Sequence, residues 1–234
     1  LCVEAWCRPS GAPRAPLAVM VCPGNPAPQF GSSHARAPLI AAIVKAVADL
    51  RVPVVSFDYA GVGMSAPGGD NTDPKKWKLP SDEQAGESTF KVLELAKEHL
   101  SDRIVACGYS FGSAQAMNVA LAGCHAYMSV SIGYNVWMFM QDPAEQEELK
   151  RSMEGHSALA CQALYVVGEK DRMSPLNQVR RLIGARKDGG AGARVEVVKQ
   201  APHDLKDKEA EAGGACAGFV GALQGELERA ATTA

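Results

Sequence analysis

The sequence predicts an α/β domain, in which helices cover both faces of a mostly parallel sheet. Three observations lead to this prediction. Short apolar segments alternate with helical segments, several apolar segments run directly into polar or glycine-containing turns, and no repeat or long linker interrupts the pattern. A length of 234 residues suits one such domain, so residues 1–234 are expected to form a single unit.

Seven segments have the composition of β-strands, being short and either apolar or alternating. In chain order they are 1–7, 17–22, 52–58, 103–107, 126–131, 162–167 and 193–198. Because helical segments separate most of them, most neighbouring strands should be parallel.

The segments between these strands are expected to be helices. Segment 35–50 is amphipathic, with one apolar face made of Leu39, Ile40, Ile43, Val44 and Val47. The next helix should begin at an N-cap on Ser81 and end near Leu100. Its expected core positions are Phe90, Leu93, Leu95 and Leu100. Further helices are expected over 113–122, 174–185 and 207–230.

The most informative segment is Gly108-Tyr109-Ser110-Phe111-Gly112, which joins the strand 103–107 to the helix 113–122. A serine on a tight strand-to-helix turn needs small residues two positions before and after it. A Cβ at either position would collide with the neighbouring strand or helix, and the strained turn holds the hydroxyl clear of the sheet. Ser110 is therefore the candidate nucleophile.

An acid and a base follow later in the chain, each just after a predicted strand. Asp171 follows the strand 162–167, and His203 follows the strand 193–198. Serine, then acid, then histidine is the order of the α/β-hydrolase triad, whereas chymotrypsin-like and subtilisin-like enzymes use other orders. The chain thus resembles the α/β-hydrolase superfamily in three motifs. The resemblance implies that fold, with Ser110, Asp171 and His203 as catalytic residues.

Three other aspartates compete for the role of the acid. Asp142 is the strongest rival, because some members of the superfamily place the acid after the sixth strand. Asp58 precedes the serine and belongs to a turn, and Asp204 adjoins the histidine and cannot easily bend back onto it. We expect Asp171 to orient His203. The remaining histidines have no paired ligand spacing and are expected to be structural: His34, His99, His125 and His156.

In the superfamily, the loop after the strand that matches 17–22 supplies a backbone donor to the oxyanion hole. Here the loop reads Pro23-Gly24-Asn25-Pro26, with Pro23 where many members carry histidine. Matching Gly24 to the motif glycine puts Asn25 in the donor position, and Pro26 has no N–H to offer. The second donor would be the N–H of Phe111, which follows the nucleophile.

The turn from Asp58 to Ser65 also resembles a superfamily motif, yet it permits another interpretation. Its spacing Gly61-x-Gly63-x-x-Ala66 mimics a dinucleotide-binding fingerprint. That fingerprint requires a helix to begin at once, so that the helix N-terminus can hold a pyrophosphate. Loop-forming residues follow instead, at 67–71, and disfavour a nucleotide site.

The resemblance also implies a short cap region at 132–163, where family members insert lids. Residues 142–154 are heavily charged and are expected to form an exposed helix. The strand 1–7 matches the family's second strand, so the first is expected to be absent or to lie outside this sequence. The expected substrate-binding residues are Tyr109 and an apolar wall; alternatively, the wall residues only pack the cap onto the sheet. The wall consists of Trp137, Met138, Phe139 and Met140.

Composition argues against several classes of function. A formal net charge of −2 offers no electrostatic case for nucleic acid, and no apolar run approaches the roughly 20 residues of a membrane span. No signal peptide is recognisable at the start. The seven cysteines are odd in number and lack Cys-x-x-Cys spacing, which favours free thiols in a reducing compartment. We expect an intracellular enzyme, cytoplasmic or organellar, with no metal or cofactor.

The expected reaction is hydrolysis of a small-molecule carboxylic ester through an acyl-serine intermediate. A short or medium acyl chain is expected, because the cap region leaves too little chain to bury a long lipid tail. The same three residues could also serve a thioesterase, a peptidase or an acyltransferase, since the fold does not fix the substrate. The alternative from a different class is a binding protein that keeps the fold without turnover.

Overall fold

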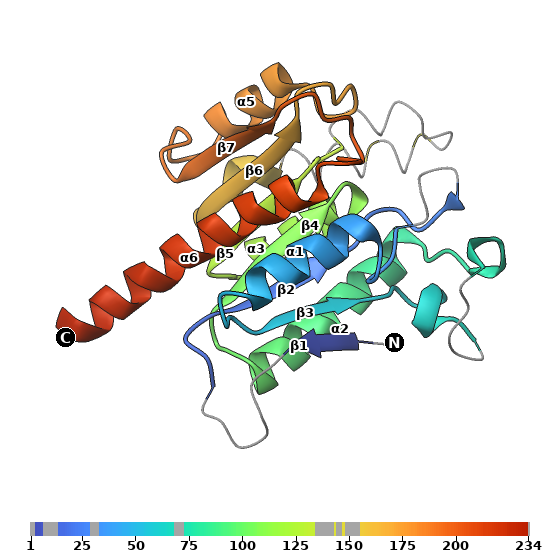
Figure 1. Ribbon diagram of the computed structural model, residues 1–234, viewed down its shortest axis with the longest axis horizontal. Coiled ribbons are helices and arrows are strands. Elements are labelled where there is room, and N and C mark those ends of the chain that lie inside the picture. The colour runs from blue at the N-terminus through green and yellow to red at the C-terminus, as the bar shows by residue number, and fades with distance from the viewer. Residues whose placement is uncertain are drawn as a thin grey trace.

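The computed structural model describes residues 3–6, 14–28, 33–67, 73–133, 143, 147 and 155–233. These residues form a seven-stranded sheet with the order β1-β3-β2-β4-β5-β6-β7 (Figure 1). Each strand lies within or close to a segment that the sequence predicted. The strands are β1 (Val3–Trp6), β2 (Ala18–Cys22), β3 (Val54–Phe57), β4 (Ile104–Tyr109), β5 (Ala126–Val130), β6 (Gln162–Gly168) and β7 (Ala193–Val198).

The pairing confirms a mostly parallel sheet. β1 runs antiparallel to β3, with Val3 opposite Phe57, and the other described pairings are parallel. In the central pair, Cys22 of β2 lies opposite Gly108 of β4. The carboxyl ends of the parallel strands therefore meet at one edge of the sheet, where α/β folds bind their ligands.

Helices cover both faces of this sheet (Figure 1). On one face, α1 (Pro38–Ala48) packs against α6 (Glu209–Thr233), which extends beyond the sheet toward the C-terminus. On the other lie α2 (Asp82–His99), α3 (Phe111–Leu121) and α5 (Leu176–Gly184). The five residues expected on the apolar face of α1 are all buried. No described helix is both long and apolar enough to cross a bilayer.

Helix α2 confirms its predicted cap and corrects its predicted core. Ser81 Oγ accepts the N–H of Gln84, and the Gln84 side chain accepts the N–H of Ser81, a capping box. Leu93 and Leu100 are buried, but Phe90 and Leu95 are 40% and 42% exposed. The buried face instead uses mostly small residues, which allow a close approach to α3. It consists of Ala85, Ser88, Thr89, Val92, Leu93 and Ala96.

Candidate active site

Ser110 occupies a strained turn between β4 and α3. Its φ is 50° and its ψ −117°, an unfavourable conformation for a residue with a side chain. A Cβ on Gly108 would lie 2.1 Å from the carbonyl oxygen of Gly112, and a Cβ on Gly112 would lie 2.3 Å from that of Pro23. The crowding expected on both sides of the serine is therefore present. Helix α3 begins at Phe111, earlier than predicted, directly after the serine.

Buried hydroxyl groups of α3 and β5 stabilise this turn. Ser113 Oγ donates to the carbonyl oxygen of Gly108 at 2.9 Å, and Ser129 Oγ donates to Ser113 Oγ at 3.0 Å. The Tyr127 hydroxyl donates to the carbonyl oxygen of Ser113 at 3.0 Å. These bonds tie α3 to β4 and β5. Sequence reasoning missed them, although a serine three positions after Ser110, facing a serine in an apolar strand, was an available signal.

The structure brings together the side chains of Ser110, His203 and Asp171. His203 Nε2 lies 3.0 Å from Ser110 Oγ, and His203 Nδ1 lies 2.9 and 3.0 Å from the two carboxylate oxygens of Asp171. The His203 side chain is 18% exposed, whereas that of Asp171 is fully buried. The three residues follow β4, β7 and β6, so they reach one point from the carboxyl edge of the sheet.

The Asp171 carboxylate is well satisfied in its buried position. Its Oδ1 also accepts the N–H groups of Met173 at 2.8 Å and Ser174 at 2.9 Å. Burial alone would raise the pKa of Asp171, but hydrogen bonds to His203 and Ser174 and the charge of His203 outweigh burial and lower it. The carboxylate is therefore ionised at neutral pH.

Among the described residues, hydrogen bonds occupy the backbone donors of Gly24 and Ala27 in the loop after β2 and leave that of Asn25 without an acceptor. Gly24 N–H donates to Ser33 Oγ at 2.9 Å, and Ala27 N–H donates to Asn25 Oδ1 at 2.8 Å. Pro23 and Pro26 have no N–H. No described residue accepts the N–H of Asn25.

The second expected donor lies beside this loop. No described residue accepts the N–H of Phe111, the first residue of α3. The first turn of α3 packs on the loop, because a Cβ on Gly112 would lie 2.3 Å from the carbonyl oxygens of both Cys22 and Pro23. The Tyr59 hydroxyl donates to the carbonyl oxygen of Pro23 at 3.0 Å and fixes the loop from another side.

The carboxylates of Asp58 and Asp204 accept hydrogen bonds from backbone N–H groups, and neither forms a hydrogen bond with His203 in the described structure. Asp58 is buried, and its carboxylate accepts the N–H groups of Ala35 at 2.7 Å and Met64 at 2.9 Å, which joins the turns after β2 and β3. Asp204 is exposed and accepts the N–H of Lys206. The rival acid Asp142 lies outside the described residues, as do all four wall residues of the cap: Trp137, Met138, Phe139 and Met140.

The turn after β3 lacks the helix that a dinucleotide site requires. Residues Gly63–Ser65 form a single turn of 3₁₀-helix, η2, instead of the start of an α-helix. Asp58 accepts the N–H of Met64, so this donor is already used within the protein. A pyrophosphate would therefore meet a carboxylate here, which argues against a nucleotide site.

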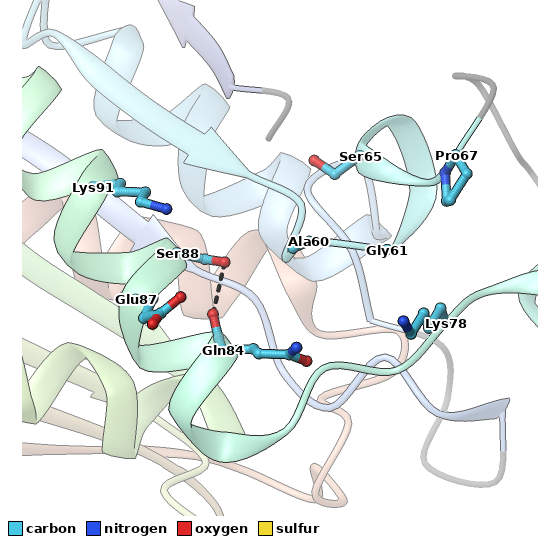
Figure 2. A pocket seen from close by; sticks show the side chains of 9 residues that line it. All are labelled: Ala60, Gly61, Ser65, Pro67, Lys78, Gln84, Glu87, Ser88 and Lys91. Atoms are coloured by element: carbon cyan, nitrogen blue, oxygen red, sulfur yellow. Dashed lines mark hydrogen bonds between the residues drawn. The ribbon is translucent and has the colours of Figure 1, made fainter.

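A separate cavity of about 360 Å³ lies between this turn and α2 (Figure 2). Figure 2 shows Gln84, Glu87, Ser88 and Lys91 of α2 on one side, with Lys78 and the turn at Gly61 across from them. Its remaining lining residues are Ala60, Ser65 and Pro67, so it contains none of Ser110, Asp171 and His203.

The described cysteines are poor alternative nucleophiles. Cys22, Cys107, Cys124 and Cys216 are buried free thiols. Burial is the main reason that the pKa of Cys22 is raised and that the pKa of Cys124 is raised to about 12. Both thiols therefore stay protonated at neutral pH. In the part of the chain that the structure describes, no three His, Cys, Asp or Glu side chains are grouped to hold a metal ion.

Solved structures match the fold, although no family model and no curated protein match the sequence. An α/β serine hydrolase homologue from Coxiella burnetii is 20% identical, with a TM-score of 0.65 over 92% of this chain and 89% of that one. An α/β serine hydrolase without a lid from Xanthomonas campestris is 18% identical, with a TM-score of 0.63 over 92% and 85%. Est1E from Butyrivibrio proteoclasticus, with ferulic acid bound, is 14% identical, with a TM-score of 0.70 over 93% and 94%. At these identities the likeness establishes the architecture alone. The chain therefore has the α/β-hydrolase fold.

Proposed function

We propose that this chain is a serine hydrolase of the carboxylesterase type, which cleaves esters of short or medium acyl chain through an acyl-serine intermediate. The observation that carries the proposal is the hydrogen-bonded series Asp171–His203–Ser110, with each bond at 2.9 to 3.0 Å. The strained backbone at Ser110 supports the same assignment, since such strain gathers at reactive residues.

The first step follows from the protonation states in this series. An ionised Asp171 only accepts hydrogen bonds, so the proton of neutral His203 lies on Nδ1 and the Nε2 lone pair faces Ser110. As Ser110 Oγ attacks the carbonyl carbon of the ester, its proton passes to Nε2. Asp171 then stabilises the imidazolium without taking its proton.

The carbonyl oxygen becomes an oxyanion in this step and needs donors. The N–H groups of Asn25 and Phe111, which no described residue accepts, are the proposed pair, each worth on the order of 3 kcal/mol in the transition state. His203 then donates its proton to the departing alkoxide, so that an alcohol leaves and the acyl group stays on Ser110. Water attacks the acyl-serine by the same route and releases the carboxylic acid.

The proposed substrate is a small molecule reached through an open cleft. The region 132–163 is short for a lid, and the fold relatives include one described as lacking a lid and one holding ferulic acid, a small carboxylic acid. An open site selects acyl length weakly, since each methylene in an apolar pocket is worth about 1–3 kcal/mol. Turnover should therefore peak at short chains and need no lipid–water interface.

The test combines a covalent probe with a substrate series. A fluorophosphonate should label Ser110, and p-nitrophenyl esters from acetate to decanoate should be turned over, with the shorter ones preferred. Ser110→Ala should lose the label and about a millionfold in kcat while keeping its circular dichroism spectrum. A matched control is Ser81→Ala, which loses a helix cap worth about 1 kcal/mol yet should keep both label and turnover.

Two results would refute the proposal. Near-native turnover by Ser110→Ala would show that Ser110 is not the nucleophile. A wild-type protein that neither reacts with the probe nor cleaves any ester of the series would favour a binding protein. Parallel assays with an acyl thioester and an aminoacyl p-nitroanilide separate esterase from thioesterase and peptidase activity.

A further inference from the structure

Tyr109 precedes the nucleophile, and its ring lies against two parts of the candidate site. Only 8% of its surface is exposed. A Cβ on Gly24 would lie 2.7 Å from Cδ1 and 2.9 Å from Cε1 of Tyr109, so the ring packs directly on the loop after β2. The ring centroid also lies 6.0 Å from that of His203, with the planes inclined by 34°, within the range of aromatic pairs.

We propose that Tyr109 is a positioning residue, whose ring sets the places of His203 and of the loop 23–25 relative to Ser110. This inference rests on the proposed function, because it concerns the base and an oxyanion donor of that reaction. It replaces the substrate-binding role that the sequence suggested for Tyr109.

The hydrogen bonds of His203 do not by themselves fix the tilt of its imidazole ring. They act at the two ring nitrogens, toward Asp171 and Ser110, and hold the imidazole at its edge. Tilting of the ring about the line between these bonds needs packing against a neighbour to limit it. Tyr109 supplies a rigid neighbour, fixed to the same strand end that carries Ser110.

The position of the loop 23–25 also depends on packing as well as on hydrogen bonds. Ser33 holds the N–H of Gly24, and Tyr59 holds the carbonyl oxygen of Pro23. The first turn of α3 packs on Cys22 and Pro23, and the ring of Tyr109 fills the space next to Gly24. A displacement of about 1 Å in a catalytic group can cost on the order of 10²-fold in rate, so this contact bears on kcat.

Other roles fit Tyr109 less well. With 8% of its surface exposed, the residue offers little area to an acyl chain. Burial first, and then the carboxylates of Asp204 and Asp171, raise the pKa of its phenol, so the hydroxyl stays neutral and is no base. Packing by the ring is what remains.

The test uses reciprocal substitutions across the contact. Gly24 does not have a positive φ, so Gly24→Ala is compatible with the backbone, and its main obstacle is the Tyr109 ring. Gly24→Ala should lower kcat by roughly 10²-fold, and Tyr109→Ala by roughly 10- to 100-fold. The double variant should be no slower than Tyr109→Ala alone, because the ring that the new Cβ meets is gone.

Controls separate positioning from general packing. Tyr109→Phe keeps the ring and should restore kcat to within about threefold of wild type. Gly218→Ala in α6 adds a Cβ that would meet nothing within 4 Å and should leave kcat unchanged. The losses should appear in kcat with KM constant, and they should be equal for acetyl and octanoyl esters. The melting temperature provides a readout without turnover: Gly24→Ala should lower it in the wild-type background and not in Tyr109→Ala.

Three outcomes would overturn the inference. These are additive losses in the double variant, a changed acyl-length profile in Tyr109→Ala, and a lower melting temperature with unchanged kcat and KM. Each of these outcomes would be found in variants of an active wild-type protein. Each would therefore refute the proposed role of Tyr109 and leave the proposed function standing. Loss of the proposed function would look different, because the wild type itself would then neither react with the fluorophosphonate nor cleave esters.

Discussion

Two histidines in this protein make the same short hydrogen bond in opposite surroundings. His203 Nε2 lies 3.0 Å from the Ser110 hydroxyl, and His156 Nδ1 lies 3.0 Å from the Tyr165 hydroxyl. The charged neighbour of His203 is the carboxylate of Asp171, whereas that of His156 is the guanidinium of Arg186. The His203 side chain is 18% exposed, and His156 is completely buried.

Under the proposed mechanism, the comparison indicates that a hydroxyl contact alone does not make a histidine a base. A carboxylate stabilises the imidazolium that forms when the base takes a proton, and partial exposure lets a substrate reach it. Burial, and then the charge of Arg186, lower the pKa of His156 to about 3, so this histidine stays neutral. Its ring packs 5.3 Å from that of Tyr127 and anchors η5 (Gly155–Ala158).

The largest effect should come from removing the carboxylate beside His203. Asp171→Asn places an amide N–H opposite His203 Nδ1. This favours the tautomer in which Nε2 carries the proton, and a protonated Nε2 cannot accept the proton of Ser110. The proposed mechanism predicts a loss of about 10⁴-fold in kcat, the loss known for established serine triads, with little change in melting temperature. Asp142→Asn is the matched control and should keep its activity. The reverse pattern, with Asp142→Asn inactive and Asp171→Asn active, would transfer the role of the acid.

The buried histidine should instead produce a pH-dependent loss of stability. A histidine whose folded pKa lies near 3 binds its proton only after unfolding, at pH values below about 6.5. Stability should therefore fall as the pH decreases through 6.5 and level off only below about 3. Between pH 8 and 5 the expected loss from His156 is about 2 kcal/mol, measured by urea unfolding.

A variant assigns this loss to its residue. The amide of His156→Asn can still hydrogen-bond the Tyr165 hydroxyl and cannot titrate, so the unfolding free energy of this variant should vary about 2 kcal/mol less over the same range. His99→Asn, at a side chain that is 63% exposed, should retain the wild-type pH dependence. An unchanged slope in His156→Asn would show that other groups cause the loss of stability.

The sequence predicted the strands and the serine turn well, because both depend on local patterns. Alternation of apolar residues identifies strands, and Gly108 is required by contacts with its sequence neighbours Gly112 and Ser113. Gly112 is required by distant contacts with Cys22 and Pro23, but it belongs to the same short pattern around Ser110. The supports of the site were missed, because they join parts of the chain that only the fold brings together: Ser129 of β5 bonds Ser113 of α3, and Ser33 bonds Gly24 of the loop after β2.

Helix α2 and His156 illustrate the same limit. Phe90 and Leu95 were expected in the core, yet the buried face of α2, which contacts α3, is a different one and consists mostly of small residues. The burial of His156 depends on β6 and on Arg186 at the end of α5, neither of which is visible in its local sequence.

The smallest effect should come from Arg186, and it separates the two causes that act on His156. The Arg186 side chain is buried, donating to the carbonyl oxygen of Cys161 at 2.6 Å and to the carboxylate of Asp188 at 3.1 Å. Because burial is the larger influence on His156, Arg186→Met should raise the pKa of His156 only part of the way toward 6.5.

The stability loss between pH 8 and 5 should then shrink by less than about 1 kcal/mol. The lost hydrogen bonds lower stability equally at both pH values, so the slope isolates the electrostatic effect. Arg186→Lys keeps a positive charge and should preserve more of the slope than Arg186→Met. If the slope disappears in Arg186→Met, the sign of the neighbouring charge governs His156 and burial does not. The two histidines would then differ mainly in whether a carboxylate or a guanidinium faces them.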